Sequence, residues 1–173
     1  IGASRVLVVD GEPGATSSSS EVYFLERALA PFGGQNETLP DVINPGGFEQ
    51  LKPEIHKVVF LANIMEPAPM AGILTNFVRD GGGVLISLGR NISPSRYNSA
   101  LGGLMPAQIK SIQNFAQPGE EGKVMAIPDL SHDLFTPFRR GGAQEFRSVR
   151  WKTLFSVDKI DDDAKVLLSL ENG

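Results

Sequence analysis

Cysteine is absent from the 173 residues, so the chain has no disulfide framework, no thiolate zinc site and no cysteine nucleophile. Long hydrophobic runs are also absent: no apolar stretch approaches the roughly 18 residues of a membrane-spanning helix. There is no excess of positive charge either, because 16 lysines and arginines stand against 20 acidic residues. We therefore expect neither direct membrane insertion by this segment nor a nucleic-acid partner.

What remains is the composition of a globular core, with 41% hydrophobic and 21% charged residues. The length suits one domain, so we expect residues 1–173 to form a single domain. A strand pattern at Arg5–Val9 begins almost at the first residue, and another at Lys165–Leu170 lies just before the last. We expect a fragment of a larger membrane protein; the alternative is a complete small protein with trimmed ends.

The first half of the chain alternates apolar runs with helical periodicity. Continuous apolar runs at Val6–Val9, Lys57–Ala62 and Val84–Leu88 predict strands buried on both faces. One amphipathic helix is expected from the capping-box spacing of Ser18 and Glu21 through Pro31. A second opens at Pro67 and Pro69 and ends at Gly81–Gly83, while Thr38–Ile43 is a weak strand and Gly47–Leu51 a short helix. Strands that alternate with helices predict βαβ units and a parallel sheet.

The second half has a different character. Ser93–Leu101 predicts a short helix, and Ile109–Phe115 fits either a strand or a helix. Lys123–Ile127 and Phe146–Trp151 predict strands with one polar face, which is typical of antiparallel sheets. We therefore expect partly antiparallel strands in the C-terminal third, in addition to the parallel sheet.

Polar side chains follow the buried strands at the edge where an open parallel sheet binds its ligands. Asp10 and Glu12 follow the first strand, Asn63 the middle one, and Arg90 and Asn91 the third. The two carboxylates suit a cation, but Asp10 as a turn cap beside a solvated Glu12 is the simpler interpretation. Arg90 can meet an anion, or pair with Asp10 or Glu12. We expect a ligand site here, without a metal or cofactor, since Gly11–Gly14 lacks the spacing of a phosphate loop.

Catalytic residues are few. Ser87 lies near the end of a buried strand and is a further candidate for the ligand site. With His132 and Asp133 it is also the candidate for a serine-dependent hydrolase. Adjacent side chains diverge, so Asp133 is poorly placed to orient His132. The only other histidine, His56, is interpreted as a surface residue.

A basic segment with one tryptophan follows in the last third. It suits either an acidic partner or the solvated face of an edge strand; its members are Arg139, Arg140, Arg147, Arg150, Trp151 and Lys152.

Several segments together resemble a known bacterial domain. They are Arg5–Gly14, Glu21–Leu29, Val58–Asn63, Phe77–Ile86, Tyr97–Asn98, Leu101–Ala107 and Ser131–Phe135. They look like the class I glutamine amidotransferase-like domain of membrane-anchored von Willebrand factor A proteins of the Bat type. In amidotransferases a strand leads into Gly-x-Cys-x-Gly; the similar run here has Leu85 at the first glycine, Ser87 at the cysteine and only the trailing Gly89 in common.

The resemblance implies a flavodoxin-like three-layer sandwich with a mostly parallel central sheet. It also implies a domain without a catalytic triad, outside the cytoplasmic membrane, whose partners are other domains of the parent chain or other proteins. The expected function is a non-catalytic interaction or ligand-sensing module. The alternatives are a hydrolase or amidase using Ser87 and His132, and a small-molecule or sugar-binding domain of the trehalose-utilisation type.

Overall fold

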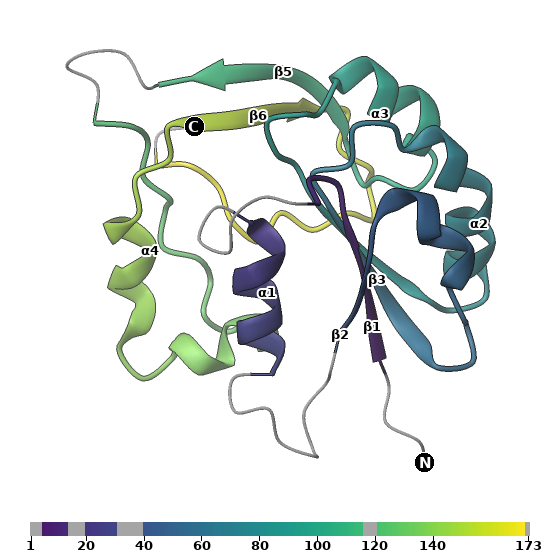
Figure 1. The fold of residues 1–173 in the computed structure, drawn as a ribbon. Helices are drawn as coiled ribbons and strands as arrows, with labels where there is room; N and C mark the ends of the chain where they lie inside the picture. The colour runs from purple at the N-terminus through teal and green to yellow at the C-terminus, as the bar shows by residue number, and fades with distance from the viewer. Residues whose placement is uncertain (1–4, 14–19, 31–39, 116–120, 172–173) are drawn as a thin grey trace. The chain divides into compact units, whose positions relative to one another are not determined.

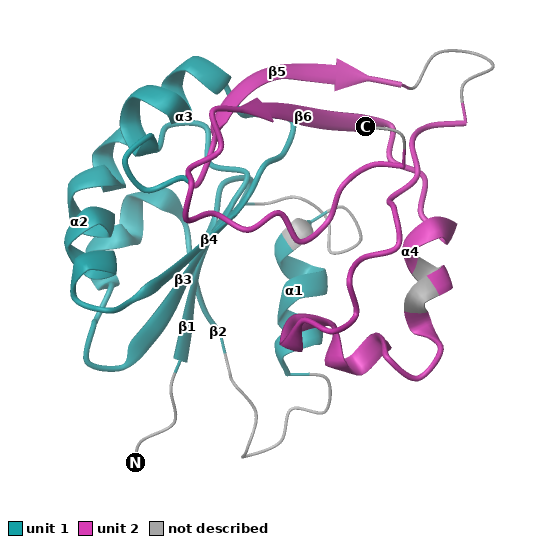
Figure 2. Cartoon of the chain, turned by 180° about the vertical axis from the view of Figure 1, so that it is seen from behind, with its two compact units in different colours: residues 1–105 teal, residues 106–173 magenta. Residues whose placement is uncertain are grey.

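The computed structural model describes residues 5–13, 20–30, 40–115 and 121–171. It divides the chain into two compact units, residues 1–105 and 106–173 (Figure 2). The first is an α/β unit with a parallel four-stranded sheet, and the second holds a separate two-stranded antiparallel sheet. The predicted combination of a parallel sheet with later antiparallel strands is confirmed at this level.

The parallel sheet has the strand order β2-β1-β3-β4. Its strands are β1 (Arg5–Asp10), β2 (Pro40–Ile43), β3 (His56–Ala62) and β4 (Gly83–Ser87). The central strands β1 and β3 are the most apolar ones, as expected for strands with a neighbour on each side. Leu7, Val8 and Val9 are fully buried, and so are Val59 and Leu61.

Helices cover both faces of this sheet (Figure 1). On one face, α1 (Glu21–Leu29) packs Val22 and Leu25 against Val8 and Ala62. On the other lie α2 (Ala68–Arg79), which buries Met70, Leu74 and Phe77, and α3 (Pro94–Leu101). The cap of α1 is Ser20, whose hydroxyl accepts from the Tyr23 amide at 3.4 Å. Ser18 and Pro31, which the sequence placed at the ends of this helix, lie outside the described residues, as does Thr38.

The second unit departs from the sequence prediction. Its sheet pairs β5 (Gln108–Asn114) with β6 (Thr153–Asp158), which resolves the ambiguous segment as a strand and adds one that was not predicted. Short helices intervene: η2 (Asp133–Phe138), η3 (Gly142–Gln144) and α4 (Glu145–Ser148).

Three predicted strands of this unit are wrong, namely those at Phe146–Trp151, Lys123–Ile127 and Lys165–Leu170. The strand expected at Phe146–Trp151 is instead α4 followed by an isolated bridge between Trp151 and Lys123. A turn of helix lets the Phe146 ring pack against Phe135 and Phe138, with ring centroids 5.8 and 4.9 Å apart. The segments 123–127 and 165–170 form no strands: an isolated bridge joins Met125 to Leu170, and the Ala126 amide donates to the Ser169 carbonyl at 2.9 Å.

Tyr97 fastens α3 to the loop after β3. Its side chain is fully buried, and its hydroxyl donates to the carbonyl of Ile64 at 2.8 Å. We expect Tyr97→Phe to lower the free energy of unfolding by about 1–2 kcal/mol, because it leaves that buried carbonyl without this donor. Chemical denaturation measures the change. Tyr23→Phe is the matched control and is expected to stay within about 0.5 kcal/mol of the wild type; equal losses in the two variants would contradict the prediction.

Candidate functional site

The carboxyl ends of β1 and β3 form the point where the strand order reverses, since β2 lies beyond β1 and β4 beyond β3. Open α/β sheets bind their ligands at such a switch point. The loops after β1, β3 and β4 carry Asp10, Glu12, Asn63, Arg90 and Asn91. We call these five residues the switch-point cluster.

Asn63 connects the three loops. Its side-chain amide donates to the Glu12 carboxylate at 3.3 Å, and its side-chain oxygen accepts from the backbone amide of Asn91 at 3.0 Å. Its own backbone amide donates to the carbonyl of Ser87 at 3.1 Å. Asn63 is 3% exposed and has a φ of 52°, in the left-handed region that asparagine tolerates better than most residues. The structure therefore shows one buried residue that fixes three loops.

The charged members of the cluster lie nearer to solvent. The Arg90 guanidinium lies 3.5 Å from the Glu12 carboxylate, and the two side chains are 69% and 41% exposed. Asp10 accepts from the backbone amide of Glu12 at 3.0 Å, which is the turn cap that the simpler interpretation predicted. An exposed ion pair of this kind adds little stability. Glu12 and Arg90 can therefore release each other and bind a ligand at a small cost in free energy.

A glycine makes the close approach of the first two loops possible. The Gly11 amide donates to the carbonyl of Ala62 at 2.8 Å, and a Cβ at this position would lie 2.1 Å from the carbonyl oxygen of Asn63. Side-chain carbons do not approach a backbone oxygen so closely, so only glycine fits. In the sequence, Gly11 is only part of a loop without phosphate-loop spacing, and nothing local signals this contact.

Ser87 ends β4 beside the cluster and is half-buried. It pairs in register with Ala62 on β3, and its carbonyl accepts from Asn63. His56 is the first residue of β3, and Ala62, which pairs with Ser87, is the last. His56 therefore lies about 20 Å from Ala62 along the strand. His56 is therefore not a base for Ser87. His132 belongs to the other unit, residues 106–173.

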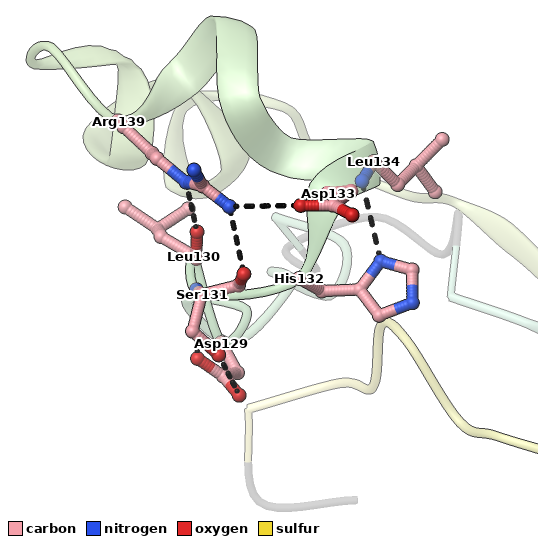
Figure 3. A network of polar contacts seen from close by, with 7 residues as sticks. All are labelled: Asp129, Leu130, Ser131, His132, Asp133, Leu134 and Arg139. Atoms are coloured by element: carbon pink, nitrogen blue, oxygen red, sulfur yellow. Dashed lines mark hydrogen bonds and ion pairs between the residues drawn. The ribbon is translucent and has the colours of Figure 1, made fainter.

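The second half of the proposed triad is not assembled as a base. The His132 Nδ1 accepts from the backbone amide of Leu134 at 3.2 Å and so caps η2 (Figure 3). Asp133 faces Arg139 instead, with 3.5 Å between carboxylate and guanidinium. In a triad the histidine Nδ1 carries a proton and donates it to the carboxylate. Here Nδ1 accepts from the Leu134 amide instead of donating to a carboxylate.

Hydrogen bonds from Arg139 and Ser131 hold the turn that contains His132. Arg139 donates to the carbonyls of Leu130 and Ser131, both at 2.7 Å, and holds the turn before η2. The backbone amide and the hydroxyl of Ser131 donate to Asp129 and hold the pKa of that carboxyl below its usual value. These contacts account for the Ser131–Phe135 motif as a turn and a helix cap.

The interpretation of His56 as a surface residue is wrong. Its side chain is 3% exposed, and its Nε2 lies 2.9 Å from Asp41, which in turn binds Arg5 at 2.7 Å. The Nδ1 of His56 accepts from the backbone amide of Lys52 at 2.9 Å. The sequence could not show this, because the contact depends on β1 lying between β2 and β3 in this register.

Three of the basic residues of the C-terminal segment have acidic neighbours. Arg147 binds Glu171 at 2.7 Å, Arg150 lies 4.0 Å from Glu121, and Arg139 faces Asp133. The segment is thus partly neutralised within its own unit.

Within the described residues, no three histidine, aspartate or glutamate side chains are grouped as a metal would need. Over the same residues, no helix combines the length and apolar character needed to cross a membrane. Comparison with models of protein families, with curated proteins and with solved structures finds no match to this chain.

Proposed function

We propose that this chain is a non-catalytic, ligand-sensing module that binds a small polar molecule at the switch-point cluster. The observation that carries the proposal is the linkage of three loops through the buried Asn63. Loops held in place before binding lose little conformational entropy when a ligand arrives. The position at the strand-order reversal agrees with ligand sites in open α/β sheets.

The chemistry of the exposed groups limits the ligand. Both ends of the Asn63 amide are occupied within the protein, so Glu12 and Arg90 supply the outward contacts. A carboxylate that accepts beside a guanidinium that donates suits a molecule with neighbouring hydroxyl groups, such as a sugar. This favours the sugar-binding form of the module.

Absence of catalysis is the second part of the proposal. The chain has no cysteine, and the His132 Nδ1 accepts from the Leu134 amide instead of donating to a carboxylate as in a triad. We place the module in the amidotransferase-like group with a flavodoxin-like three-layer arrangement, since β2-β1-β3-β4 forms the first four strands of the flavodoxin order. The resemblance of the Bat-type motifs supports an extracytoplasmic position in a bacterial membrane-anchored protein, with other domains or proteins as partners.

Thermal unfolding in the presence of glucose, galactose and trehalose tests the proposal. We expect at least one of these sugars to raise Tm by on the order of 5 °C at a concentration well above its Kd. Arg90→Ala removes the shift, because it deletes the outward donor. Arg96→Ala is the matched control, since Arg96 pairs with Glu66 elsewhere on the same unit and its loss leaves the shift intact.

Two results would overturn the proposal. One is the absence of any sugar-dependent shift, or a shift that Arg90→Ala does not reduce. The other is hydrolysis of p-nitrophenyl esters or glutamine by the purified chain that is lost in both Ser87→Ala and His132→Gln, since this would establish the hydrolase alternative.

A further inference from the structure

The connection between β2 and β3 covers less of the sheet than a helix would. A crossover between parallel strands is usually an α-helix. Here residues 44–55 contain only the 3₁₀ helix η1 (Pro45–Gln50), kinked at Gly47 and anchored by the buried Phe48. A cavity of about 310 Å³ remains between this connection and the strands β1 and β2.

The cavity is lined by both polar and apolar side chains, and more of its open surface is polar than apolar. Val42, Ile43 and Ile55 contribute apolar side chains, and the charged residues of the lining are Arg5, Asp41 and Lys52. An apolar cavity of about 150 Å³ accommodates benzene, so the volume here suits a small organic molecule with one ring or a short chain.

The one carboxylate of the cavity is already satisfied. One oxygen of Asp41 binds Arg5 at 2.7 Å, and the other receives the Nε2 proton of His56 at 2.9 Å. The Nδ1 of His56 accepts from the Lys52 amide, so Nε2 is the ring nitrogen that donates to Asp41. Arg5 offsets the charge of Asp41, and Lys52 gives the set of lining residues an excess of one positive charge.

We propose that this cavity binds a small organic carboxylate. The apolar body of the ligand packs against Val42, Ile43 and Ile55, and its carboxylate meets Lys52 and the guanidinium of Arg5, which is 42% exposed and has further N–H donors. The buried His56 keeps the floor rigid by fixing Asp41. Arg5 and Asp10 are the two ends of β1, about 17 Å apart, so this site is separate from the switch-point cluster and independent of the proposed function.

Amide chemical shifts of the 173-residue chain during titration with benzoate test the proposal. We expect saturable shifts at Leu7, Val42 and Ile55 with a Kd on the order of 1 mM. Lys52→Gln keeps the length of the side chain and the backbone donor to His56 but removes the charge, and it weakens benzoate binding by about threefold. The matched control is Lys57→Gln, because Lys57 binds the carbonyl of Pro53 and does not line the cavity.

Two further probes separate the charge from the apolar body. Benzamide has the same ring without the negative charge, and inorganic phosphate has the charge without the ring; neither is expected to give saturable shifts at these amides. Equal binding of benzamide, equal binding of phosphate, an unchanged Kd in Lys52→Gln, or benzoate shifts confined to other residues would each overturn the proposal.

Discussion

Replacing Gly11 with alanine is expected to lower the free energy of unfolding of residues 1–105 by about 3 kcal/mol or more. The new Cβ would lie 2.1 Å from the carbonyl oxygen of Asn63 and 2.6 Å from that of Ala62. Both are backbone atoms of the central strand β3 and its loop, so they cannot turn aside as a side chain can. The loops after β1 and β3 must separate, which lengthens the hydrogen bond from Gly11 to Ala62.

Denaturation followed by far-UV circular dichroism measures this loss. Fluorescence is unsuitable because the single tryptophan, Trp151, belongs to residues 106–173. Gly72→Ala is the matched control, because nothing lies within 4 Å of a Cβ at this position. Alanine is favoured over glycine in a helix interior, so this variant is expected to raise the free energy of unfolding by about 0.5–1 kcal/mol. If Gly11→Ala unfolds at the same denaturant concentration as the wild type, the close approach of the loops is not present in solution.

The Asn63 variants are expected to separate hydrogen bonding from backbone conformation. Asn63→Gly keeps the left-handed conformation but removes two side-chain hydrogen bonds, so we expect a loss of about 2 kcal/mol. Asn63→Ala adds the strain of a side chain at a φ of 52°, which brings the loss to about 3 kcal/mol. Chemical denaturation gives both values.

Amide hydrogen exchange provides a second measurement on these variants. The Asn91 amide loses its acceptor in both, so its exchange is expected to accelerate in both. Asn76→Ala is the control, because Asn76 lies on the outer side of α2 and contacts only Arg79 through its side chain in the described structure. Equal losses for glycine and alanine would show that the backbone conformation contributes nothing, and unchanged stability in Asn63→Gly would contradict the linking role.

The parallel sheet could be predicted because its signal is local. The runs at Val6–Val9, Lys57–Ala62 and Val84–Leu88 coincide with β1, β3 and β4 to within one residue at each end. The burial on both faces predicted for the third run is wrong, because β4 is an edge strand and Leu85 is 48% exposed. The C-terminal unit could not be predicted in the same way. Phe146–Trp151 is equally compatible with a turn of helix, and the choice depends on rings brought from Phe135 and Phe138.

For the candidate site, the sequence could predict which residues lie together but not their contacts or burial. Parallel strands end at one edge, so sequence order alone brought Asp10, Glu12, Asn63, Arg90 and Asn91 together. The φ of Asn63, the contact of Gly11 and the burial of His56 required the strand register, which a single sequence does not contain. An asparagine directly after a buried strand was the one available signal for the left-handed turn.

The centre of the sheet is occupied by the strand that is synthesised before its partners. β1 pairs with β2 and β3, which follow it in the sequence by about 35 and 50 residues. During translation the apolar run Val6–Val9 therefore stays unpaired until these two strands have been synthesised. Unpaired apolar strands of this kind are prone to intermolecular association. Arg5 and Asp10 flank this run with opposite charges, so the residues that border the two proposed sites also protect the nascent chain.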